Sequence, residues 1–87
     1  MADLFNLKDT QEWISSWSNE YRGRRGLGTV KRFAVYVERV AVEQRANFES
    51  CTSGGRAPHW CKPAEYRACV ELLENTARRA RGGIWPG

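Results

Sequence analysis

The feature that most constrains the fold is an uninterrupted stretch of about twenty residues, from Val30 to Glu49, that contains neither glycine nor proline. Its five valines would suit a β-strand. An ordinary strand, however, is only about five or six residues long. The apolar residues also recur with the 3.6-residue period of an α-helix, at Val30, Phe33, Ala34, Val37, Val40, Ala41 and Phe48. We therefore predict a helix over about residues 29–50.

A second helical pattern precedes this stretch. Asp9 and Glu12 have the spacing of a capping box, in which an acceptor begins the helix and a glutamate follows three residues later. Apolar residues then follow at helical spacing, at Trp13, Ile14, Trp17 and Tyr21. Gly23 supplies a stop signal. The pattern predicts a helix over about residues 10–22.

A third helical pattern begins at Pro63, a residue that suits the first turn of a helix. Its apolar stripe consists of Tyr66, Cys69, Val70, Leu73, Ala77 and Ala80. Gly82 and Gly83 end the pattern, which predicts a helix over about residues 63–81. We expect Trp85 to fold back after this helix and close the core.

The composition fits one small folded unit. The chain has 87 residues, of which 41% are hydrophobic and four are tryptophan, and this is too apolar for a disordered chain. A chain of this length has room for one modest core. We predict a compact, all-α, three-helix domain that spans residues 1–87.

Residues 22–32 form a basic, glycine-containing segment, and no acidic residue occurs between Glu20 and Glu38. A helix that begins at Thr29 would direct its free amide hydrogens into this segment, which is a geometry that binds anions. The segment matches no phosphate-loop pattern, so the alternative is a solvated turn. The residues expected to contact the phosphates of DNA or RNA are Arg22, Arg24, Arg25, Lys31 and Arg32.

The central helix offers a second candidate surface, because residues 33–42 are apolar nearly all round. Val35 and Val42 lie opposite the main apolar stripe. Either the neighbouring helices and residues 4–5 cover these valines, or the valines mark a dimer or target-protein interface. The candidate interface residues are Val35, Tyr36, Arg39 and Val42.

The expected third helix carries oppositely charged side chains four residues apart on its exposed face, Arg67 with Glu71 and Glu74 with Arg78. We expect each pair to neutralise itself and leave a solvated face.

Three cysteines, an odd number, favour reduced thiols and a cytoplasmic protein without a leader or membrane segment. The residue types of a zinc site are present, at Cys51, His59, Cys61 and Cys69, but their spacing argues against one. We expect no metal or cofactor. The sequence does not decide whether Cys51 and Cys61 form a disulfide across the intervening loop. The sequence contains no recognisable catalytic set, so we expect no enzyme.

Residues 60–63, with the sequence Trp-Cys-Lys-Pro, open the third helical segment. This entry resembles the aromatic-Cys-x-Pro entry of the last helical segment in small periplasmic immunity proteins, which block toxic effectors by direct binding. The chain departs from that pattern in its odd number of cysteines and in the expected lack of a leader, so we do not assign it to that family. In size it is also similar to phage-encoded inhibitors of host defence.

Two hypotheses for function follow. In the first, the protein is a small inhibitor or an immunity or anti-defence factor that docks on a protein or nucleoprotein complex. In the second, it is a nucleic-acid-binding accessory protein that uses the basic segment.

Overall fold

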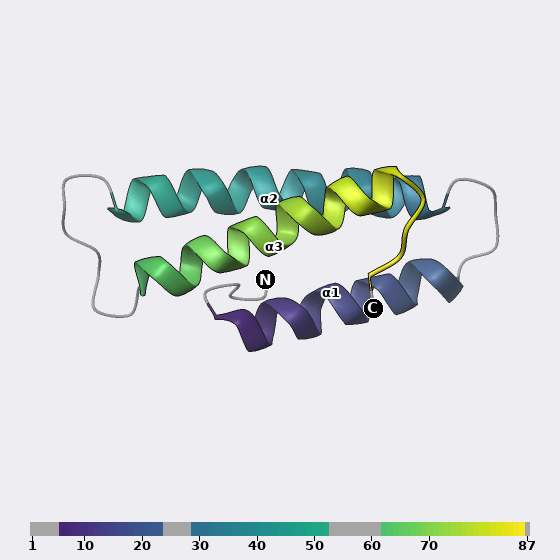
Figure 1. Cartoon of the computed structure of the whole chain (residues 1–87), viewed down its shortest axis with the longest axis horizontal. Helices are drawn as coiled ribbons and strands as arrows, with labels where there is room; N and C mark the ends of the chain where they lie inside the picture. The colour runs from purple at the N-terminus through teal and green to yellow at the C-terminus, as the bar shows by residue number, and fades with distance from the viewer. Residues whose placement is uncertain (1–5, 24–28, 53–61, 87) are drawn as a thin grey trace.

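The computed structural model describes residues 6–23, 29–52 and 62–86, which form three α-helices (Figure 1). Helix α1 spans Leu7–Gly23, α2 spans Thr29–Thr52 and α3 spans Pro63–Arg81. Helices α1 and α3 run in the same direction and α2 runs in the opposite one. The predicted all-α, three-helix architecture is confirmed, and the start of α2 and both ends of α3 agree with the sequence analysis.

Helices α2 and α3 make the most extensive contact in the molecule. Small side chains lie at this contact, where Ala34 and Ala41 of α2 and Ala77 and Ala80 of α3 are all buried. Because the distance between two helix axes depends on the side chains between them, alanines allow a close approach. The α2–α3 pair therefore forms the centre of the core.

Helix α1 is attached mainly through aromatic side chains. The ring of Trp17 lies 5.0 Å from that of Tyr36, centroid to centroid, and the ring of Tyr21 lies 5.6 Å from that of Phe33. Trp13 also contacts Tyr36, at 5.6 Å. These rings bury large apolar areas, but they also hold the backbone of α1 further from its neighbours than alanines would.

The N-terminal cap of α1 lies earlier than the sequence analysis placed it. The amide of Asp9 donates to Oδ1 of Asn6 at 2.8 Å, and Nδ2 of Asn6 donates to Oδ2 of Asp9 at 2.8 Å. The first bond satisfies one free amide at the helix start, and the second holds the two side chains together. The expected cap at Asp9 is therefore wrong, and Thr10, which directly follows it, is fully buried inside the helix.

The C-terminus of α3 ends in a Schellman motif. Gly83 adopts a left-handed conformation with φ of 88°, which favours glycine. Its amide donates to the carbonyl of Ala80 at 3.0 Å, and the amide of Ile84 donates to that of Arg79 at 3.0 Å. The turn directs Trp85 back onto the core, 5.4 Å from the ring of Phe33, as expected.

Two polar side chains are buried in different ways. At one end of the core, the hydroxyl of Tyr66 donates to Oε1 of Gln44 at 3.0 Å, and Gln44 is itself buried. Ser18 on α1 is only 2% exposed, and its hydroxyl has no hydrogen-bond partner within the part of the chain that the structure describes. The hydroxyl of Tyr66 therefore has a hydrogen-bond partner, whereas the hydroxyl of Ser18 has none among the described residues.

Replacement of Phe33 by alanine tests this description of the core. Phe33 is fully buried and contacts the rings of both Tyr21 and Trp85. We expect Phe33→Ala to lower the free energy of unfolding by about 3–5 kcal/mol. We expect Val35→Ala, on the exposed side of the same helix, to change it by less than about 0.5 kcal/mol. Urea denaturation, monitored by circular dichroism, measures the free energy of unfolding of both variants. Equal losses in the two variants would contradict the assignment of Phe33 to the buried side of α2 and of Val35 to its exposed side.

Candidate interaction surfaces

The described helices leave the two valines on the outer side of α2 exposed. Val35 is 61% exposed and Val42 is 64% exposed, so no described helix covers them. They are seven residues apart, which is close to two helical turns, and they therefore lie on one side of α2. Residues 4 and 5, which were also expected to cover this helix, lie outside the described residues.

We define the outer face of α2 as the exposed side chains that fall within about 100° of arc around these valines. These are Lys31, Arg32, Val35, Arg39, Val42, Ala46, Glu49 and Ser50. The face is basic at its N-terminal end, carries the two valines and Arg39 in its middle, and has one acidic residue, Glu49, near its C-terminal end. The sequence analysis did not identify Ala46 and Glu49, although their spacing from Val35 and Val42 places them on the same stripe.

Tyr36 does not belong to this outer face. It is partly buried, and its ring lies against the rings of Trp13, Trp17 and Tyr21 of α1. Burial, followed by proximity to Tyr21 and Glu43, raises the pKa of its hydroxyl above the usual value of 10.0. Of the four expected interface residues, the structure thus places Val35, Arg39 and Val42 together and Tyr36 in the contact with α1.

The basic segment is only partly described. Arg22 lies in the last turn of α1, with its guanidinium 5.6 Å from the centroid of the Trp85 ring. Lys31 and Arg32 are exposed near the start of α2, whose first turn contains no acidic residue. The end of α1 and the start of α2 lie at the same end of the molecule (Figure 1). Arg24 and Arg25, with Gly26 and Gly28 after them, lie outside the described residues.

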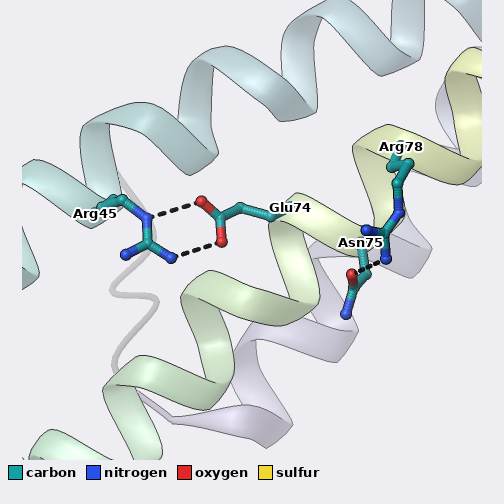
Figure 2. A network of polar contacts seen from close by, with 4 residues as sticks. All are labelled: Arg45, Glu74, Asn75 and Arg78. Atoms are coloured by element: carbon teal, nitrogen blue, oxygen red, sulfur yellow. Dashed lines mark hydrogen bonds and ion pairs between the residues drawn. The ribbon is translucent and has the colours of Figure 1, made fainter.

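Charged pairs tie α2 to α3. Nε and Nη2 of Arg45 donate to the two carboxylate oxygens of Glu74 at 2.8 and 2.7 Å (Figure 2). Arg81 likewise pairs with Glu38. The expected pair between Glu74 and Arg78 is therefore wrong, because the two-pronged contact with Arg45 takes both oxygens of the carboxylate. Arg78 donates to Asn75 instead.

A groove of about 280 Å³ lies beside the outer face, between α2 and α3. Its lining includes Ala41 and Ala77, with Val42 beside them. A second groove, of about 320 Å³, lies between α1 and α3 and is lined in part by Ile14 and Leu72. The rest of the lining of the first groove is charged and consists of Glu38, Glu74, Arg78 and Arg81.

The described residues contain no group of three histidine, cysteine or acidic side chains that could hold a metal ion. Cys69 is fully buried in the core, where burial raises the pKa of its thiol. Cys51 and Cys69 are both free thiols. His59 and Cys61 complete the set of residue types whose spacing argues against a zinc site, and Cys61 is the other half of the disulfide that the sequence leaves undecided; both residues lie outside the described residues. None of the three described helices is apolar enough over a sufficient length to cross a bilayer.

Comparison of the chain with protein-family models, curated proteins and solved structures finds no match. The resemblance of residues 60–63 to periplasmic immunity proteins gains no support from these comparisons, and Trp60 and Cys61 lie outside the described residues. The assignment of function therefore depends on the surfaces described above.

The pair between Arg45 and Glu74 makes stability depend on pH. Arg45 holds the pKa of the Glu74 carboxyl below its usual value of 4.5. A carboxyl with a lowered folded-state pKa stabilises the fold above its unfolded-state pKa, and this contribution is lost as the pH falls through the folded-state value. We expect Glu74→Gln to lower the melting temperature slightly at pH 7, with the difference from the unmodified protein disappearing in acid.

Thermal unfolding followed by circular dichroism at neutral and acidic pH measures this effect. Glu12→Gln is the matched control, since Glu12 is an exposed residue on α1 and is not among the acidic side chains that act on Arg45. A Glu74→Gln difference that stays constant down to acid would contradict an ion-pair contribution.

Proposed function

We propose that this protein is a non-enzymatic docking protein that binds a protein or nucleoprotein complex through the outer face of α2. The observation that carries the proposal is the exposure of Val35 and Val42, at 61% and 64%, on one side of a single helix. Complete burial of a valine side chain contributes about 1.5–3 kcal/mol. A partner that covers both valines would therefore gain a substantial part of its binding free energy here.

Two further properties of the outer face support docking. Arg39 lies between the valines and is exposed, and arginine is enriched at protein interfaces because it combines an apolar stem with a fork of donors. The valines are also held on a 24-residue helix that packs against both other helices. A rigid surface of this kind loses little conformational entropy on binding.

We further propose that docking inhibits the target, so that the protein acts as an inhibitor or as an immunity or anti-defence factor. A small rigid domain affects its target mainly by occupying a surface that another molecule needs. Lys31 and Arg32 make one end of the outer face positive. This charge suits an acidic protein, or a site on a nucleoprotein complex that borders nucleic acid. The cytoplasm is the proposed location, because it keeps cysteine thiols reduced.

Replacement of both valines by aspartate tests the proposal. We expect the Val35→Asp, Val42→Asp variant to keep its helical circular dichroism, because both side chains are exposed. A target identified by crosslinking with the unmodified protein, then purified, should bind this variant at least about thirtyfold more weakly.

The matched control is the Ser16→Asp, Asn19→Asp variant, which adds the same two charges to exposed positions of α1. This control should bind the purified target as the unmodified protein does. Equal binding by both variants would place the docking surface elsewhere, and loss of helical signal in the valine variant would assign the valines to the core.

The second candidate function is nucleic-acid binding by the basic segment. The observation that favours it is the exposure of Lys31 and Arg32 at the start of a helix whose first turn lacks an acidic residue. The amide dipoles and these side chains add to one positive potential. This candidate differs from docking in its dependence on salt, because phosphate contacts release counterions.

We expect any binding to duplex DNA to weaken with salt, with a log–log slope of about 0.9 for each phosphate contact. Replacement of Arg24, Arg25, Lys31 and Arg32 by alanine should abolish it, as measured by fluorescence anisotropy with labelled DNA and RNA. No binding of the unmodified protein to either nucleic acid at low salt would reject this candidate.

A further inference from the structure

The two ends of the outer face of α2 carry charges of opposite sign, and Arg39 adds a positive charge near its middle. Lys31 and Arg32 lie at the N-terminal end, Glu49 lies at the C-terminal end, and the valines lie between them. All of these side chains are exposed. A surface with this arrangement is complementary to itself when two copies meet in opposite directions.

We propose that the outer face of α2 pairs with the same face of a second copy of this chain, with the two helices antiparallel about a two-fold axis. The inference rests on the proposed function in that it uses the same face, and it names the partner that covers this face when no target is bound. The dimer would thus keep Val35 and Val42 from water until a target displaces the second copy.

One alignment of the two helices places apolar residues opposite each other and, at both ends, residues of opposite charge opposite each other. When the two-fold axis passes between residues 40 and 41, Val35 lies opposite Ala46 of the second copy. Arg32 then lies opposite Glu49 of the second copy, about 25 Å from the same pair at the other end of the contact. The apolar residues and the opposite charges are therefore matched at the same time.

The middle of the contact is also matched in this alignment. Arg39 lies opposite Val42 of the second copy, so that its apolar stem covers the valine. Its guanidinium then lies near Glu43, the next residue after that valine. The stem contributes apolar burial and the charged end remains close to a carboxylate.

A parallel arrangement has the opposite consequence. It would place Lys31 and Arg32 against the same residues of the second copy, and Glu49 against Glu49. Like charges in direct opposition disfavour association, and the dipoles of two parallel helices would also repel. The charge pattern therefore selects the antiparallel pair.

The expected dimer is weak. A single helix pair buries less than the roughly 800 Å² per partner that is typical of stable complexes. We expect dissociation constants in the micromolar range, so that the dimer forms reversibly. A target that covers more of the surface than the second copy can replace it by mass action.

Sedimentation velocity of the full chain, from low micromolar to millimolar concentration and with a reducing agent, tests the proposal. The reducing agent excludes a disulfide through Cys51, which is a free and partly exposed thiol. We expect the mean mass to rise from one chain to two with concentration. Val42→Lys should keep the protein monomeric over this range, because it places a second positive charge opposite Arg39 of the second copy.

A charge exchange tests the alignment itself. Arg32→Glu and Glu49→Arg should each raise the dimer dissociation constant by about tenfold or more, because each change places like charges opposite one another twice. The double variant restores opposite charges and should return the dissociation constant close to that of the unmodified protein. Glu71→Arg, on the exposed side of α3, is the matched control and should leave it unchanged.

Three results would overturn the proposal: a monomer at every concentration, a dimer that Val42→Lys leaves intact, or no recovery in the double variant. A monomer would leave the docking proposal standing, because binding of the purified target is measured separately. Conversely, a dimer with the expected responses, together with a valine variant that still binds its target, would support self-association and reject docking through this face.

Discussion

The close contact between α2 and α3 determines where the rest of the molecule can lie. Alanines on both helices allow this approach, and the pairs Arg45–Glu74 and Arg81–Glu38 connect the same two helices. One side of α2 is thereby used for α3, and a neighbouring side holds the aromatic contact with α1. No other part of the chain that the structure describes covers the remaining side. The outer face is thus a geometric consequence of how the other two sides of α2 are used.

The aromatic side chains of the described helices lie mainly in the contact between α1 and α2, whereas the exposed apolar side chains of α2 are valines. The rings of α1 meet Phe33 and Tyr36, and Trp85 returns from the C-terminus to the same region. This concentrates the largest apolar groups inside the fold. The exposed apolar groups on α2 are the smaller valines, which limit the hydrophobic area in contact with water and are consistent with a surface that is reversibly covered.

The sequence predicted the fold well, because the 3.6-residue period extends over each helix. It missed the start of α1, because Asn6–Asp9 and Asp9–Glu12 have the same capping spacing and only the structure shows which one caps the helix. A helical wheel gives the direction of Val35 but not the position of the neighbouring helices, so the sequence did not decide whether Val35 is exposed. The partner of Glu74 was also beyond prediction, because Arg45 is 29 residues away in the chain and the i, i+4 rule considers only local neighbours.

The buried hydroxyl of Ser18 has a consequence for how this domain can change. A polar group enclosed without compensation lowers the stability of a protein by about 1–3 kcal/mol. The free energy of unfolding of this domain could therefore be raised by a substitution at Ser18, a buried position. Replacement of Ser18 by alanine would remove the unpaired hydroxyl and raise the stability, so that the domain would tolerate more destabilising substitutions elsewhere.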